Sequence, residues 1–342
     1  MAKVVVDAMG GDLGMSAVLD GVSSLSLEDN AIQMLLVGDA DAINEALAER
    51  RHSPRKIQVV HASGVIQMDE DPKTALVEKE DASIAIAMKL LANGDADALV
   101  SAGHTGATIL AASQHLERLP GIRRAALAAV HPTENRHGPK DDPFALILDV
   151  GATLSATAED LVSFAIMGSA YAHIISDNPS PSVALLSNGT EPNKGTEVIK
   201  AAHAALREHP NINFAGNIEG LDLPRGTADV VVCDGFLGNV VLKMLEGVTE
   251  VVTDLAKDAY ARKFLWRLGL TMLSQGLRQL RNMTDWKQYG GAPLLGFDRV
   301  IIKAHGRSNP RAIRNAIKVA AKAVDKDLAG QIRAGMSAMS GV

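Results

Sequence analysis

Short apolar runs rich in β-branched residues alternate, along almost the whole chain, with longer segments whose apolar residues recur every three or four positions. The first pattern predicts buried strands and the second predicts amphipathic helices. Strands are predicted at 3–6, 34–37, 57–60, 98–101, 126–130, 145–150, 183–187, 230–233 and 300–303. Predicted helices between them include 83–92, 105–118, 158–175 and 196–208. Because strands that alternate with helices pair in parallel and are covered on both faces, the sequence predicts a three-layer α/β/α fold with a mainly parallel sheet.

Length and composition agree with one large core. The chain has 342 residues, of which 47% are hydrophobic and only 3% aromatic, so we expect a core of aliphatic side chains and alanine. No long Pro-, Gly- or Ser-rich linker divides the chain, and no repeat of fixed period is evident. We therefore predict a single α/β unit over residues 1–342, either as one body or as two lobes around a cleft.

Charge and apolar patterning disfavour several classes of protein. A net charge of −6 argues against a general nucleic-acid binder, because affinity for the phosphate backbone needs concentrated Lys and Arg. The first residues lack the plan of a signal peptide, and no run of about 18 uncharged apolar residues occurs, so we expect a cytoplasmic protein. The single cysteine, Cys233, follows an apolar run and is expected to be a buried, inert thiol.

Five predicted strands pass directly into glycine turns that precede a helical pattern. In the first, the strand ends at Asp7 and the chain turns at Gly10 and Gly11. The other four junctions lie at 100–110, 147–155, 230–243 and 301–313. Backbone N–H groups in such turns, together with the N-terminus of the following helix, bind anions. Since ligands of parallel sheets bind at the carboxyl ends of the strands, we expect all five junctions to meet there and bind a small anionic or phosphorylated substrate.

One segment, residues 257–287, breaks the alternation. It contains seven basic and two acidic residues, and its apolar residues recur at helical spacing, which predicts two amphipathic helices. One interpretation is a helical pair packed on the protein's own core or on a second subunit. The other is a surface that contacts a membrane or an acidic partner protein, because basic residues flank large apolar ones. The predicted contact residues are Arg262, Lys263, Phe264, Leu265, Trp266, Arg267, Leu268, Leu270, Arg278 and Arg281.

Seven sequence blocks, in order from residue 4 to about residue 320, resemble the bacterial phosphate acyltransferases. They are DAMGGD (7–12), SAGHTGA (101–107), LDVGA (148–152), NFAGNIEG (213–220), VCDGFLGNVVLKMLEG (232–247), YGGAPLLG (289–296) and IKAHGRS (302–308). Those enzymes convert fatty acyl-acyl carrier protein and inorganic phosphate into acyl phosphate. The resemblance implies a fold of the isocitrate and isopropylmalate dehydrogenase type, a homodimer, no metal or organic cofactor, and a role in phospholipid synthesis. It also implies delivery of the product to a membrane glycerol-3-phosphate acyltransferase. With the basic segment 257–287, this gives the expectation of a cytoplasmic protein that can lie peripherally on the inner face of the cell membrane.

The chain departs from the family pattern at several positions. His104 and Thr153 stand where the family usually has Asn, and Ala125 replaces a usual proline. The run at 78–81 carries Glu78, Glu80 and Asp81 where the family is usually lysine-rich, which disfavours anion binding there.

The implied reaction needs little covalent chemistry from the protein, because phosphate at neutral pH is already an anionic nucleophile that can attack a thioester. The site must hold two negatively charged partners together, stabilise an oxyanion and exclude water. We predict catalytic roles for Asp234, Asn239, His305, Lys303 and Lys194, with His305 also able to protonate the departing thiolate. The predicted substrate- and phosphate-binding residues are Asp7, Gly10, Gly11, Gly103, His104, Thr105, Gly106, Gly235, Gly238 and Lys243.

Three alternatives remain for the function. A short-chain acyl-coenzyme A phosphate acyltransferase would share the chemistry but not the carrier. A dehydrogenase is disfavoured because no strict G-x-G-x-x-G with a following acid is present. A non-catalytic membrane-surface scaffold would use only residues 257–287.

The stretch 131–137, with His131 and His137 around Glu134, is expected to be an ordinary polar loop and not a metal site.

Overall fold

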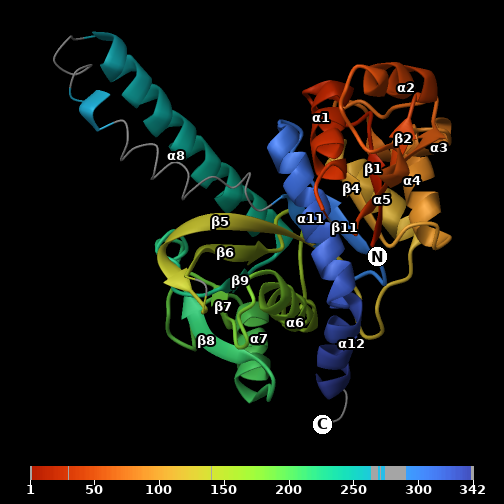
Figure 1. The fold of residues 1–342 in the computed structure, drawn as a ribbon. Coiled ribbons are helices and arrows are strands. Elements are labelled where there is room, and N and C mark those ends of the chain that lie inside the picture. Colours follow the sequence, from red (N-terminus) through yellow and green to blue (C-terminus); the bar gives the residue numbers. More distant parts are fainter. Residues whose placement is uncertain are drawn as a thin grey trace.

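A mixed sheet of eleven strands forms the centre of the protein in a computed structural model (Figure 1). The structure describes residues 2–29, 31–139, 141–262, 269, 271–273 and 290–339. The strands are β1 (Lys3–Asp7), β2 (Gln33–Gly38), β3 (Ile57–His61), β4 (Ala98–Ser101), β5 (Ala126–His137), β6 (Asp142–Leu148), β7 (Ser182–Leu186), β8 (Asn213–Ile218), β9 (Val230–Val232), β10 (Ala292–Leu295) and β11 (Val300–Lys303).

Helices connect most of these strands, as the alternation predicts. They are α1 (Gly14–Ser26), α2 (Ala40–Ala48), the short 3-10 helix η1 (Pro54–Lys56), α3 (Pro72–Glu78), α4 (Ser83–Ala92), α5 (Thr105–His115), α6 (Ala158–Ile175), α7 (Glu197–Glu208), α8 (Gly235–Arg262), α11 (Pro310–Asp325) and α12 (Leu328–Met339). Several begin at a side-chain cap. Asp71 and Asn309 each precede a proline at the first helical position, and Thr157 forms a capping box with Asp160.

The sheet consists of two parallel blocks that run in opposite directions. Its order is β3-β2-β1-β4-β11-β10-β5-β6-β9-β7-β8. The block β3-β2-β1-β4-β11 is parallel throughout, and so is the block β6-β9-β7-β8. Between them, β10 pairs antiparallel with both β11 and β5, and β5 pairs antiparallel with β6. The expectation that all five glycine junctions meet at one edge is therefore wrong, because the carboxyl ends of the two blocks point in opposite directions.

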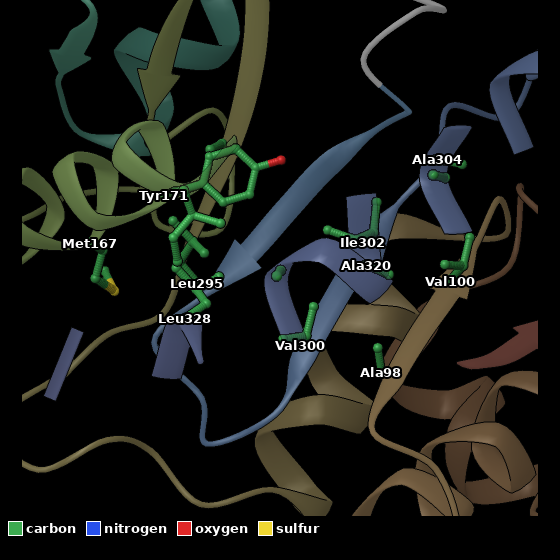
Figure 2. Packing of buried hydrophobic residues seen from close by; sticks show 14 of the residues in the cluster. Ala98, Val100, Met167, Tyr171, Leu295, Val300, Ile302, Ala304, Ala320 and Leu328 are labelled. Atoms are coloured by element: carbon green, nitrogen blue, oxygen red, sulfur yellow. The ribbon is translucent and has the colours of Figure 1, made fainter. Parts of the chain in front are cut away.

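Two apolar layers lie on the two faces of this sheet, which confirms the three-layer α/β/α architecture. In β1, Val4 and Val6 face the layer formed with α1, α2, α6, α7, α11 and α12. Val5 faces the other layer, which contains α3, α4, α5 and the inner side of α8. Figure 2 shows the first layer where the two blocks join: side chains of β4, β10 and β11 pack there with α6, α11 and α12.

Two sequence predictions need correction in this part of the fold. The stretch 131–137 is not a polar loop but the second half of β5, which pairs with β6 through His131–Ala145 and His137–Asp142. Strands β8 and β10 were not predicted as strands. The β5–β6 hairpin and β10 supply the antiparallel pairs that reverse the direction of the sheet.

Helix α8 extends well beyond the sheet (Figure 1). The basic segment predicted at 257–287 begins inside this helix, since α8 continues to Arg262. Nine of its predicted contact residues lie outside the described residues: Lys263, Phe264, Leu265, Trp266, Arg267, Leu268, Leu270, Arg278 and Arg281. The side chain of Arg262 also lies outside them. Among the helices that the structure describes, none has the length and apolar character needed to cross a bilayer.

Candidate active site

The glycine junctions form two groups. The junctions after β1, β4 and β11 form the Asp7 group, and those after β6 and β9 form the Asp149 group. In the Asp7 group, the buried Asp7 carboxylate accepts hydrogen bonds from the hydroxyls of Ser83 and Ser101, each at 2.7 Å. The β1 and β4 turns also touch, because a Cβ atom on Gly10 would lie 2.5 Å from the backbone of Gly103. Only glycine permits this approach, so Asp7 and Gly10 order the turn.

Lys303 contributes a buried amine that interacts with the carboxylates of Asp7 and Asp12, which flank the first of these turns. It ends β11 and is 6% exposed, and its Nζ donates a hydrogen bond to the carbonyl oxygen of Ala304. Burial lowers the pKa of Lys303 to about 8, while the carboxylates of Asp7 and Asp12 oppose that shift. The amine is therefore mostly protonated at neutral pH. It supplies positive charge in a low-dielectric environment near the carboxylates of Asp7 and Asp12.

The turn after β4 is partly closed by its own side chains. The amide of Gly103 donates to Ser101 Oγ at 3.0 Å, and the amide of Ala107 donates to Nδ1 of His104 at 3.2 Å. His104 is thus the N-cap of α5, a role that an Asn would also fill. Within the described residues, no hydrogen bond is recorded for the amides of Thr105 and Gly106, so these two remain as donors at this turn.

The Asp149 group is organised by a carboxylate that the sequence prediction did not single out. Asp149 is fully buried, and its Oδ1 accepts hydrogen bonds from the amides of Leu127, Gly151 and Ala152 at 2.9–3.1 Å. Its Oδ2 accepts one from the amide of Thr153 at 2.7 Å. Burial raises the pKa of the Asp149 carboxyl, and the hydrogen bonds oppose that shift. The motif LDVGA therefore encodes a turn wrapped around its own aspartate.

The N-terminus of α8 packs onto this turn, which corrects the predicted role of its glycine amides. The amide of Gly235 donates to Thr153 Oγ1 at 3.2 Å, and that of Gly238 donates to the carbonyl of Asp234 at 2.9 Å. Asp234 is the N-cap, since its Oδ1 accepts from the amide of Leu237 at 2.9 Å. Because these amides are already engaged, Gly235 and Gly238 serve close packing and do not cradle an anion. No hydrogen bond is recorded for the amide of Phe236 in the described part of the chain.

Helix α8 connects the two groups. Asn239 is exposed in its second turn, close to Gly151 of the Asp149 group, where a Cβ atom would lie 3.9 Å from Asn239 Oδ1. One turn further on, Lys243 pairs with Glu246 at 2.7 Å. Further along the helix, Glu250 lies 3.4 Å from Arg307 in the loop after β11. The face of α8 that carries the predicted Asn239 and Lys243 therefore leads from one group to the other.

The histidines beside α8 are neutral at pH 7. Burial lowers the pKa of His305, and the carboxylate of Glu246 opposes the shift. Its Nδ1 accepts from the amide of Arg307 at 3.1 Å, so the ring hydrogen is on Nε2. The neutral ring of His305 therefore offers an N–H donor at Nε2 and carries no positive charge. Burial likewise lowers the pKa of His131, on the neighbouring β5, to about 4, again opposed by Glu246.

Lys194 is exposed in the loop that follows β7, at the same strand ends as the Asp149 group. That loop is closed by a hydrogen bond from the amide of Gly195 to Asn188 Oδ1 at 2.9 Å. Cys233 is buried as predicted, and burial raises the pKa of its thiol far above the ordinary value. It is not available as a nucleophile.

A cavity of roughly 200 Å³ lies away from both groups. It is bounded by α6, α12 and the amino ends of β7 and β8, and no Lys, Arg, Asp or Glu lines it. It contains none of the predicted site residues.

Comparison with known proteins identifies the family. A family model described as "Fatty acid synthesis protein" matches residues 2–331. The phosphate acyltransferase of Dictyoglomus turgidum is 40% identical over 98% of each chain. That of Heliobacterium modesticaldum is 43% identical over 97% of this chain and 96% of its own. The chain belongs to the phosphate acyltransferase family. The resemblance predicted from the seven sequence blocks is thereby confirmed.

Solved structures share the fold of this family member at low sequence identity. A phosphotransacetylase from Streptococcus pyogenes superposes with a TM-score of 0.63 and 18% identity, covering 95% of this chain and 94% of its own. The EutD phosphotransacetylase from Staphylococcus aureus gives a TM-score of 0.58 and 16% identity, with 94% of each chain covered. At such identities, the likeness establishes a shared fold.

Proposed function

We propose that the protein transfers a fatty acyl group from acyl-acyl carrier protein to inorganic phosphate and releases acyl phosphate for phospholipid synthesis. The observations that support this most directly are the buried cation Lys303 and the unengaged amides of Thr105 and Gly106 in the Asp7 group, together with the amide of Phe236 in the Asp149 group, without an activated serine or cysteine among the described residues. Donors of this kind bind phosphate and stabilise an oxyanion, and they need no covalent acyl-enzyme.

The proposed reaction is a direct attack. Phosphate binds beside Gly10, Gly11 and Lys303, and one of its oxygens adds to the thioester carbonyl. The tetrahedral oxyanion is stabilised by neutral donors, for which Nε2–H of His305 and the amide of Asn239 are the candidates. The thiolate leaves as the carbonyl re-forms, and it takes up the proton that the hydrogen phosphate loses. The products are acyl phosphate and the free carrier thiol.

The first test mixes the purified protein with long-chain acyl-acyl carrier protein and measures free carrier thiol with and without phosphate. We expect thiol release that depends on phosphate. Short-chain acyl-coenzyme A, tested at the same concentration, is expected to react more slowly, because it lacks the carrier. A faster reaction with acyl-coenzyme A would establish the short-chain alternative. No release from either donor would reject the acyltransferase proposal and favour the scaffold.

We further propose a homodimer in which α8 contacts a second copy. Six apolar side chains along this helix are 49–64% exposed: Val240, Met244, Val248, Val251, Val252 and Leu255. Five of them recur every three to four residues, and Val252 adjoins Val251. An exposed apolar stripe of this length is typical of an interface between subunits. It begins beside Asn239, so a second copy would cover the helix next to the candidate site.

Replacing Val248 with Glu is expected to dissociate this dimer, because a charge would be buried at the centre of the stripe. Light scattering after size-exclusion chromatography should then give a mass near the 36.0 kDa of one chain, against twice that for the unmodified protein. Leu221→Glu is the matched control, since Leu221 is a similarly exposed apolar residue outside α8. A dimer that survives Val248→Glu would reject α8 as the interface.

The cellular setting is proposed on the family resemblance together with the basic segment 257–287. We place the protein in the cytoplasm, peripheral on the inner face of the membrane. There its segment would contact acidic carrier protein or lipid, and its product would pass to a membrane glycerol-3-phosphate acyltransferase.

A further inference from the structure

Thr153 forms hydrogen bonds with both junctions of the Asp149 group, the turn after β6 and the start of α8 after β9. Its amide donates to Asp149 Oδ2 at 2.7 Å, and its hydroxyl oxygen accepts from the amide of Gly235 at 3.2 Å. It is 6% exposed. Thr153 therefore links the turn after β6 to the first residue of α8 through its side chain.

We propose that the Thr153 hydroxyl is a positioning group for the acyl transfer reaction: it fixes the N-terminus of α8, and with it Asn239, relative to the Asp149 turn. The inference rests on the proposed function for the reaction that it assists. Thr153 itself is not catalytic, because its hydroxyl is engaged with Gly235 and is buried.

Close packing of α8 against the Asp149 turn makes the position of the helix sensitive to the hydrogen bond between Gly235 and Thr153. A Cβ atom on Gly235 would overlap the backbone of Thr153, and one on Gly238 would overlap the backbone carbonyl of Asp149. The first turn of α8 thus lies directly against the turn, with no side chain between them. Backbone hydrogen bonds pair Cys233 with Leu148 and Asp149 just before the helix, and the hydrogen bond from Gly235 to Thr153 is the directional contact made by the first residue of the helix itself.

Loss of this hydrogen bond is expected to displace Asn239, because Asn239 lies in the same helix as Gly235. Asn239 follows Gly235 by four residues, so it lies one helical turn above it on the same side. If the amide of Gly235 lost its acceptor, it would remain buried and unpaired, and the helix would shift or fray to reach water. A shift of about 1 Å is enough to reduce catalysis by roughly 100-fold when it displaces a group that must meet the transition state.

Two substitutions separate the hydroxyl from the bulk of the side chain. Thr153→Val keeps the shape and removes the acceptor, whereas Thr153→Ser keeps the acceptor. We expect Thr153→Val to lower kcat for phosphate-dependent thiol release by about tenfold or more, with a smaller change in the KM for the acyl donor. Thr153→Ser is expected to retain most of the rate. Equal rates for the unmodified protein and Thr153→Val would overturn the proposal, as would an equal loss in both variants.

A second Thr-to-Val substitution controls for stability alone. Thr157 caps α6 with its hydroxyl, which accepts from the amide of Asp160 at 3.3 Å, and α6 carries none of the predicted site residues. Thr157→Val is expected to lower the Tm while kcat stays within about twofold. If Thr157→Val lowered kcat as much as Thr153→Val does, the effect would be one of general stability, and the positioning role would be rejected.

Hydrogen exchange provides a readout that does not depend on the reaction. In the full-length protein, a peptide containing residues 234–239 is expected to exchange slowly in the unmodified protein and in Thr153→Ser, and faster in Thr153→Val. Unchanged exchange in Thr153→Val would show that the hydroxyl does not hold the helix. If the unmodified protein transferred no acyl group, the proposed function would fail, but the exchange measurement would still test the link between Thr153 and α8.

Discussion

Gly238→Ala is expected to produce the largest loss of any single methyl group added to this protein. A Cβ atom at position 238 would overlap the backbone carbonyl of Asp149, which accepts a hydrogen bond from Sγ of Cys233 at 3.4 Å. Neither partner is the end of a flexible side chain, so α8 must move away from the turn. We expect a destabilisation of about 3 kcal/mol or more and the loss of acyl transfer. Thermal unfolding and the thiol-release assay measure the two effects.

The same helix offers a matched control. Gly247 also lies in α8, and a Cβ atom there would have no neighbour within 4 Å. Gly247→Ala is expected to leave activity unchanged and to stabilise the helix by up to about 1 kcal/mol, because alanine has the higher helix propensity. A Gly238→Ala variant as stable and active as Gly247→Ala would show that α8 does not pack on the Asp149 turn as described.

Lys303→Met is expected to reduce phosphate-dependent acyl transfer by roughly 100-fold, the usual effect of removing one preorganised charge from such a site. Methionine preserves most of the buried side-chain volume but removes the positive charge beside Asp7 and Asp12. We expect the kcat/KM for phosphate to fall more than the kcat/KM for the acyl donor, because the lost charge acts on the anion. A matched control is Lys322→Met on α11, which removes a lysine that pairs with Asp177; its activity should be unchanged.

The pH dependence gives an independent check on Lys303. The amine has a pKa of about 8 in the folded protein, below its ordinary value of 10.5. It is charged below pH 8 and neutral above, so kcat/KM for phosphate in the unmodified protein should fall as the pH rises through about 8. This basic limb should be absent in Lys303→Met. A Lys303→Met variant that kept both the rate and the limb would remove Lys303 from the proposed site.

The spacing of apolar residues in the sequence was enough to predict the bounds of helices and strands whose buried side chains recur regularly. The predicted ranges 83–92, 98–101, 158–175 and 300–303 coincide with α4, β4, α6 and β11. Each has an apolar pattern that a single secondary structure explains. Strand β10 escaped prediction because it is short and contains a proline, and the second half of β5 because its residues are polar. Both are defined by their partners across the sheet and not by their own periodicity.

In the candidate site too, the sequence predicted the local turns at the glycine junctions but not the tertiary contacts of their amides. Their sequences correctly indicated tight turns after strands, and Gly10 and Gly238 are needed for backbone contacts that exclude a Cβ atom. The sequence did not reveal which amides remain available for a ligand. Those of Gly103 and Gly235 are engaged by Ser101 and Thr153, residues that lie in or beside the same motifs but whose hydroxyls could equally have faced solvent.

The sequence by itself determined the family, the layered α/β architecture and the first strand ending at Asp7, Gly10 and Gly11, because strand and helix periods and glycine turns are local properties of the chain. Only the tertiary structure decided that the junctions form two groups linked by α8, with Asp7 ordering one and Asp149 the other. The reason is physical: the direction of each strand and the partner of each buried amide depend on residues that are distant in sequence, so they are fixed only when the sheet assembles.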